Sequence, residues 1–167
     1  SKNDFVFYAA KNPELINANA DGVLLCDLKQ DKTPEQLYLQ YINSKDLYSK
    51  YTAIEESKEN VGKNPFATKT VLAALKDNFY RNRLEALASI PEDSKDFLAE
   101  VEKLAQNDPK TLVKGEAIGV LAKTKNAKYL PLFEKNMQVV SSSVKGNSLA
   151  GIANLAPEKV ATYAEKV

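Results

Sequence analysis

The sequence repeats itself with a period of 31 residues, and this repeat constrains the fold more than any other feature. Residues 83–90 (RLEALASI) align without gaps with residues 114–121 (KGEAIGVL) and 145–152 (KGNSLAGI). Each copy begins with a basic residue, has a small residue three positions later, and places aliphatic residues at helical spacing around it. A unit of this length cannot bury its apolar face alone, so successive units must stack on one another. The repeat therefore predicts helix pairs packed side by side.

The expected fold is mostly α: an α-α superhelix of HEAT or armadillo type, preceded by a short β-hairpin segment. We predict that residues 33–167 form the HEAT-like α-α superhelical domain. Residues 1–32 are expected to be the terminal strands of a preceding β domain, or an N-terminal cap on the helices. Helices near 45–58 and 158–167 would be the two ends of the array.

Helix-start signals divide the chain after residue 32. Thr33, Asn64 and Asp108 each stand directly before a proline, and Gln36 completes a capping-box pattern with Thr33. Two apolar sets follow helical spacing, one from Phe97 to Ala105 and one from Leu130 through Phe133 and Met137 to Val140. These signals predict roughly nine helices of about 10 to 15 residues, with further caps at Asp77, Ser94, Asn126 and Ser142.

The first 32 residues have a different pattern. Phe5 to Ala9 and Val23 to Leu28 are β-branched or aromatic runs, and Asp21-Gly22 suits a tight turn. This pattern predicts a hairpin from Leu15 to Leu28. Because two or three strands are not stable alone in water, they must pack on something else.

Composition excludes several function classes. Lys and Arg total 23 against 22 Asp and Glu, so the net charge of +1 gives no support to a nucleic-acid or membrane surface. The chain has no histidine, which excludes histidine-based catalysis and a His-ligated zinc site within it. No apolar stretch is long enough to span a bilayer, and no signal peptide is recognisable, so we expect a soluble chain. The start at Ser1 without methionine suggests a piece of a longer protein, whose compartment stays open.

The residues with possible chemistry have simpler structural interpretations. The carboxylate pairs Glu55-Glu56 and Glu100/Glu102 lie near lysines and are expected on solvated helix faces. Residues 146–151 lack the spacing of a phosphate loop and fall inside a repeat copy. Ser141, Ser142 and Ser143 are expected to cap a helix, and Cys26 is expected to be a packed small side chain. We therefore predict no catalytic, cofactor-binding or metal-binding residue in this chain.

Aromatic and basic residues offer contacts rather than chemistry. Core or interface packing is the favoured interpretation of four tyrosines, with exposed contact to a partner as the alternative: Tyr38, Tyr41, Tyr48 and Tyr51. Arg81 and Arg83 flank Phe79-Tyr80. We favour a structural ion pair between such a basic residue and an acidic residue of the neighbouring repeat over substrate binding.

The chain resembles the C-terminal part of M1-family zinc aminopeptidases. Residues 12–17 (NPELIN), 21–25 (DGVLL) and 33–37 (TPEQL) look like the junction between the small β-sandwich domain and the C-terminal helical domain of that family. Residues 76–87 (KDNFYRNRLEAL) are similar to the D-x-F/Y/W-x-x-x-R-x-x-A-L segment of the HEAT-like domain in its bacterial, Bacteroidetes-like members.

This resemblance implies a parent hydrolase that removes N-terminal amino acids from peptides with one zinc ion. The H-E-x-x-H and G-x-M-E-N segments of the family are absent here, so no catalytic residue is carried over and the zinc is expected in the catalytic domain of the parent. The helical domain of the family covers the catalytic domain and shapes peptide access. The implied partners are the parent's catalytic and β-sandwich domains, with contact to peptide substrate possible, and the parent would be cytoplasmic or periplasmic.

Two other functions remain open. One is a free-standing HEAT-repeat module for protein–protein interaction. The other is a relative of the HEAT-like lyases for bilin chromophores, for which no nucleophilic or ligand-binding residue stands out. The predicted N-terminal strands favour the aminopeptidase interpretation, because a free-standing solenoid needs no hairpin.

Overall fold

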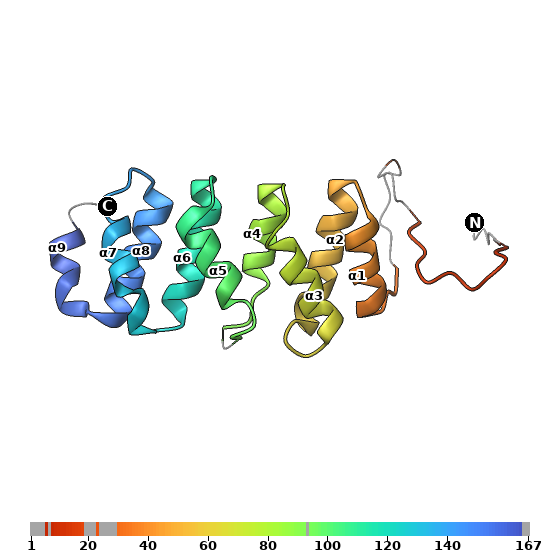
Figure 1. Cartoon of the computed structure of the whole chain (residues 1–167), viewed down its shortest axis with the longest axis horizontal. Helices are drawn as coiled ribbons and strands as arrows, with labels where there is room; N and C mark the ends of the chain where they lie inside the picture. Colours follow the sequence, from red (N-terminus) through yellow and green to blue (C-terminus); the bar gives the residue numbers. More distant parts are fainter. Residues whose placement is uncertain (1–5, 7, 19–22, 24–29, 93, 165–167) are drawn as a thin grey trace, which may run out of the picture.

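The protein is all-α in the residues that its computed structural model describes, which are 6, 8–18, 23, 30–92 and 94–164. Within these ranges the chain forms nine α-helices arranged in one elongated row, and no strand occurs there (Figure 1). The helices are α1 (Pro34–Asn43), α2 (Leu47–Ser57), α3 (Pro65–Ala74), α4 (Tyr80–Ala88), α5 (Leu98–Asn107), α6 (Thr111–Lys123), α7 (Leu130–Asn136), α8 (Ser142–Leu155) and α9 (Val160–Ala164).

Two of the predicted cap-then-proline signals start helices as expected. The Thr33 hydroxyl accepts a hydrogen bond from the backbone N–H of Gln36, and the Thr33 N–H donates in return to the Gln36 side chain, so α1 begins at Pro34. The Asn64 side chain accepts from the backbone N–H groups of Phe66 and Ala67 at the start of α3. Both caps satisfy backbone donors that the first helical turn leaves unpaired.

Other predicted caps were wrong in position. The N-cap residues of α4, α6 and α8 are Phe79, Lys110 and Ser141, in place of the predicted Asp77, Asp108 and Ser142. Ser142 is the first residue of α8. Asn126 caps only the short 3₁₀ turn Ala127–Tyr129. Ser94 starts no helix, because α5 begins after Phe97.

Two helices are shorter than predicted. The α4 helix has 9 residues and α7 has 7, and the 3₁₀ turn Ala127–Tyr129 directly precedes α7. As a result Val140, which was expected on an apolar helix face, lies beyond the end of α7 and is 96% exposed.

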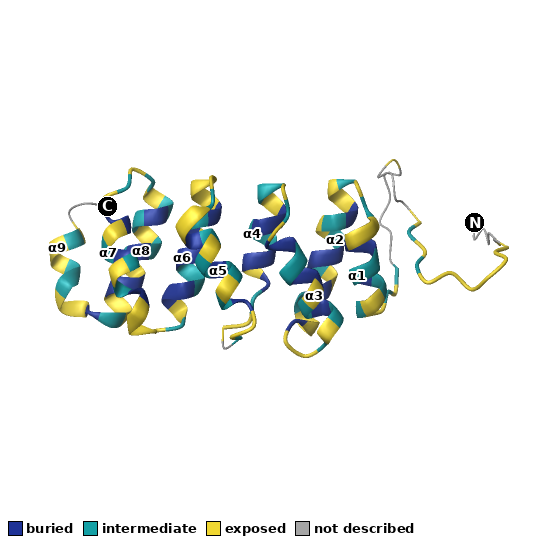
Figure 2. Ribbon diagram, in the orientation of Figure 1, coloured by how far each residue is buried: buried dark blue, intermediate teal, exposed yellow. Residues whose placement is uncertain are grey.

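The three repeat copies lie on α4, α6 and α8, which stack in that order along the row. Their small residues, Ala86, Ala117 and Ser148, are fully buried at the helix contacts. Aliphatic residues of the same copies join one continuous core that runs through the row (Figure 2). Small residues at these positions allow the helix backbones to approach closely, so the recurring position of the small residue serves packing.

The contact between α6 and α8 is the most extensive in the row. Asn147 donates a hydrogen bond to the Gly115 carbonyl at 2.9 Å, and Asn154 donates to the Ala122 carbonyl at 3.2 Å. The two amides are seven residues apart on α8, and the two carbonyls that accept from them are seven residues apart on α6. They therefore fix one register of α8 on α6.

Most of the predicted hairpin, residues 19–22 and 24–28 with Cys26, lies outside the described residues, as does part of the run Phe5–Ala9. The described residues of this region, among them Leu15 to Ala18 and Val23, form no strand. In Figure 1 residues 8–18 extend beyond the α1 end of the row. Among the helices of the described residues, none combines the length and the apolar character that a membrane span requires.

Candidate functional site

The candidate site is built around the five-residue connection between α3 and α4, residues 75–79. Asp77, in the middle of this connection, accepts a hydrogen bond from the backbone N–H of Phe79 at 2.8 Å. The same carboxylate accepts from the Tyr41 hydroxyl at 2.7 Å and from Lys50 Nζ at 2.8 Å. Asp77 thus joins the α3–α4 connection to both α1 and α2, which explains why it is not available as a helix cap.

The electrostatics of Asp77 follow from these contacts. Burial alone would raise the pKa of this carboxyl, but the hydrogen bonds from Lys50, Tyr41 and the Phe79 backbone outweigh burial and lower its pKa to about 2. Burial and the neighbouring Asp77 carboxylate raise the pKa of Tyr41. Asp77 is therefore a fixed negative charge that has no proton to give near neutral pH.

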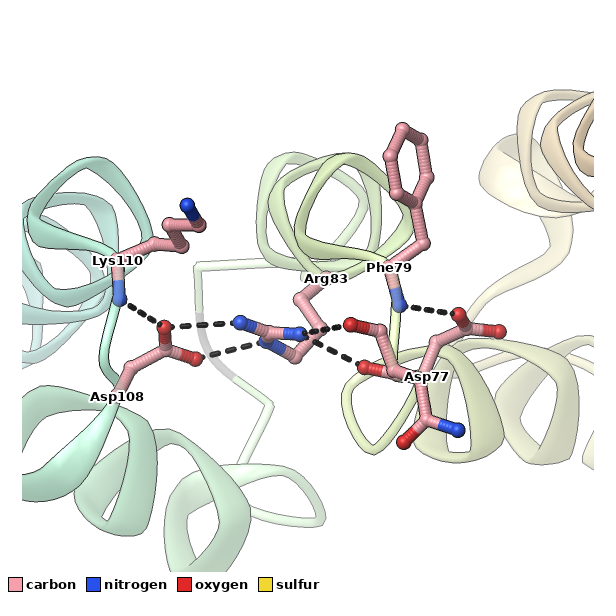
Figure 3. A network of polar contacts seen from close by, with 6 residues as sticks. Asp77, Phe79, Arg83, Asp108 and Lys110 are labelled. Carbon is pink, nitrogen blue, oxygen red and sulfur yellow. Dashed lines mark hydrogen bonds and ion pairs between the residues drawn. The ribbon is translucent and has the colours of Figure 1, made fainter.

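Arg83 holds the connection from the other side. Its guanidinium donates to the backbone carbonyls of Asp77 and Asn78 at 2.8 and 3.1 Å, and makes two hydrogen bonds of 2.7 and 2.9 Å to the Asp108 carboxylate (Figure 3). Asp108 also accepts from the backbone N–H of Lys110 at 2.8 Å. The predicted ion pair between Arg83 and an acidic residue of the next repeat is confirmed, since Asp108 lies in the connection between α5 and α6.

Two hollows flank this connection. The larger, of about 600 Å³, lies toward α5 and α6, and its lining includes Leu75, Tyr80, Glu100, Leu104 and Lys110. The second, of about 490 Å³, lies toward α1 and α2, and its lining includes Ile42, Lys45, Leu47 and Lys50. Both are lined by residues 76–79. We call the two hollows together the 76–79 groove.

The rim of the groove combines aromatic rings with cations. The Phe79 and Tyr80 rings meet edge to face with centroids 5.4 Å apart. Lys110 Nζ lies 5.6 Å and the Arg81 guanidinium 5.9 Å from the centroid of the Tyr80 ring. Such distances allow cation–π attraction. The predicted Arg81 and Phe79-Tyr80 cluster is therefore a surface feature, whereas Arg83 beside it is buried.

The carboxylates that line the groove are held in fixed polar contacts. Asp77 is committed to three donors, and Glu100 pairs with Lys76 and Lys103 at 3.4 and 2.8 Å. Hydrogen bonds from Lys103 and Lys76 outweigh slight burial and lower the pKa of Glu100. Within the described ranges no three side chains of ligand type come together in a way that could hold a metal ion. The groove offers fixed charges and apolar surface, which orient a ligand.

The two members of each predicted carboxylate pair, Glu55-Glu56 and Glu100/Glu102, have different surroundings in the structure. Glu55 shares Lys58 with Glu85 of α4, so it ties α2 to α4, while its neighbour Glu56 is exposed. Glu102 accepts hydrogen bonds from Lys128 at 2.8 Å and Tyr129 at 2.6 Å. These contacts link neighbouring helix pairs, so the predicted solvated faces are partly structural bridges.

The four tyrosines of α1 and α2 differ in how far they are buried. Tyr41 belongs to the core, and Tyr38 is half-buried with its ring 6.0 Å from that of Phe66. Tyr48 and Tyr51 are 56% and 42% exposed on α2, so these two are not core residues, and packing at an interface or contact with a partner stays a prediction for them. Residues 146–151 lie inside α8, as predicted, where Gly151 packs against Phe133.

Comparisons with protein-family models, with curated proteins and with solved structures give no match for this chain. The function must therefore be argued from the residues, the fold and the groove. Sequence reasoning singled out Asp77, Phe79, Tyr80 and Arg83 but missed Lys76 and Lys110, because only the stacking of α4 beside α6 brings them to one surface.

Proposed function

We propose that this chain is a non-catalytic helical-repeat domain that covers and shapes a neighbouring protein domain. The stacked helix pairs are interpreted as a HEAT-like α-α superhelix, and the resemblance of residues 12–37 and 76–87 makes the neighbour the catalytic domain of a zinc-dependent M1-family aminopeptidase. In that arrangement the superhelix limits which peptides reach the zinc of the parent. Solenoid surfaces are broad and suit such a covering role.

The observation that carries this proposal is an exposed apolar surface at the α1–α2 end of the row. Tyr48 and Tyr51 are 56% and 42% exposed. They lie on α2, which together with α1 forms the end of the row beyond which residues 8–18 extend (Figure 1). Large side chains that remain this accessible together are typical of a surface that another domain covers.

The stacking of the repeat copies supports the superhelical interpretation. The main contacts of each helix are with near neighbours along the row, and ion pairs such as Arg83 to Asp108 cross from one helix pair to the next. Repeat proteins are stabilised by contacts of this nearest-neighbour kind. The same stacking would serve the alternative function, a free-standing HEAT-repeat interaction module.

Reading the coding DNA immediately upstream of Ser1 in the source organism separates the two functions. An open frame of several hundred codons with H-E-x-x-H and a downstream glutamate supports the aminopeptidase proposal. A stop codon followed by a start signal just before Ser1 refutes it and leaves the interaction module.

A dye-binding experiment tests the covering surface itself. We expect the chain to enhance the fluorescence of an apolar dye, and expect the Tyr48→Ser/Tyr51→Ser variant to reduce this enhancement by half or more. Leu112→Ser is the matched control, because Leu112 is also 55% exposed but lies on α6, away from this end. Equal effects of both changes, or no dye binding at all, would count against a docking surface at α1–α2.

A further inference from the structure

The 76–79 groove has an excess of positive charge that its own carboxylates do not neutralise. Lys50 pairs with Asp77, Arg83 pairs with Asp108, and Glu100 is shared by Lys76 and Lys103. Two further lining lysines, Lys45 and Lys110, form no ion pair within the described part of the chain. One stands in each hollow, so the groove presents a cation on either side of the α3–α4 connection.

Apolar surface lies between these cations. Leu75, Leu104 and Pro109 line one hollow, and Ile42 and Leu47 line the other. The Phe79 ring belongs to both. Figure 3 shows the Phe79 ring and the Lys110 side chain pointing to the same side of the buried network, away from Arg83 and Asp108. A ligand that reaches Lys110 can therefore also contact the ring.

The groove is also held in shape before any ligand arrives. Arg83 fixes two consecutive carbonyls of the connection, Asp77 fixes its Phe79 N–H, and Asp108 fixes the Lys110 backbone. The side chains of Arg83 and Asp108 are only 10% and 2% exposed. A binding surface whose backbone is already ordered loses less conformational entropy on association.

We propose that the 76–79 groove binds an extended acidic segment of a partner protein, with carboxylates at Lys45 and Lys110 and an apolar side chain against Phe79. Spaced carboxylates alternating with apolar residues match the spaced cations and the apolar floor. A nucleic-acid backbone matches less well, because its continuous phosphates would pass Glu100 and Asp77 in the same lining and the whole chain carries a net charge of only +1. This proposal does not depend on the parent being an aminopeptidase.

The test is a fluorescence-anisotropy titration of the whole chain with a fluorescein-labelled peptide of alternating Glu and Phe. The comparison probes are the same peptide with Gln in place of Glu and a single-stranded oligonucleotide of equal charge. We expect the acidic peptide to bind, the Gln peptide to bind at least about ten-fold more weakly, and added salt to weaken binding. The oligonucleotide should bind more weakly than the acidic peptide.

Substitutions locate the site. Lys45→Gln and Lys110→Gln should each weaken the acidic peptide by about three- to five-fold, since each removes one exposed charge contact, and the double variant by about ten-fold or more. Lys135→Gln is the matched control, because Lys135 is exposed on α7 and lines neither hollow. Absence of peptide binding, equal losses in the control, or tighter binding of the oligonucleotide would each overturn the proposal. The far-ultraviolet circular dichroism of every variant verifies that it is folded.

Discussion

The packing of α7 on α8 leads to a quantitative prediction at Gly151. A methyl group added at this helix position would lie 2.5 Å from Cδ2 and Cε2 of Phe133 and 2.9 Å from its Cγ. Carbon atoms in ordinary contact are about 3.5–4.0 Å apart, so the ring would have to move by roughly 1 Å. Phe133 is fully buried and has little room to do so.

The expected cost is the balance of two effects. Overpacking of this kind costs about 1–3 kcal/mol, and the upper end applies because a buried aromatic ring is displaced. Alanine is favoured over glycine inside a helix by about 1 kcal/mol. Gly151→Ala should therefore lower the free energy of unfolding by about 2 kcal/mol, which for a domain of this size corresponds to a fall in Tm of about 6 °C.

Gly146 provides a matched control on the same helix. A methyl group there meets nothing within 4 Å, so Gly146→Ala gains the helix preference alone and should raise the free energy of unfolding by about 1 kcal/mol. Urea unfolding followed by circular dichroism at 222 nm measures both variants. Equal stabilisation by the two substitutions would refute the reasoning, because it would mean that Phe133 does not cover Gly151.

Three further predictions concern the polar contacts. Arg83→Met should lower the free energy of unfolding by about 3–5 kcal/mol in urea titrations, because it leaves the buried Asp108 carboxylate without its cation. Because the pKa of Asp77 is lowered from 3.8 to about 2 in the folded chain, its contribution of about 2 kcal/mol is complete above pH 5 and is lost as the pH falls toward 2; the difference in stability between the unchanged protein and Asp77→Asn should narrow over this interval. Thr33→Ala should cost about 1 kcal/mol by loss of the α1 cap, seen as a lower Tm.

Each of these predictions has an outcome that would contradict it. Lys123→Met removes an exposed ion pair with a 3.8 Å separation and should cost well under 1 kcal/mol, so an equal loss in Arg83→Met would contradict the burial argument. A constant difference between Asp77→Asn and the unchanged protein from pH 6 to pH 2 would show that the carboxylate is not stabilised in the fold. An unchanged Tm for Thr33→Ala would contradict the capping box.

The sequence predicted the helical composition because its signals were local. Thr33 and Asn64 stand next to prolines, and caps of this kind need no tertiary information. The same kind of signal predicted Asp77 and Asp108 as the caps of α4 and α6, which placed the starts of these helices wrongly. Both carboxylates instead bind side chains that lie 25 to 36 positions away in the sequence. A carboxylate that ties neighbouring helix pairs has the same local sequence pattern as a cap.

The groove could be predicted only in part. Arg83, Phe79 and Tyr80 were recognised as a cluster, and the ion pair between repeats followed from the period. The positions of Lys45 and Lys110 on one surface depend on how α1, α2 and α6 stack around the α3–α4 connection. The angle between stacked helices is set by side-chain packing over the whole row, and the spacing of residues within one repeat does not contain it.

The unequal packing along the row determines where the molecule can bend. The α8 helix is bound to α6 by broad contact and by the paired amides of Asn147 and Asn154, whereas α4 meets α6 over a smaller surface with Arg83 and Asp108 as its polar link. Bending of the row should therefore concentrate at the α4–α6 junction. The larger hollow of the groove lies at this same junction, so the Arg83–Asp108 link limits how far bending of the row can change the width of that hollow.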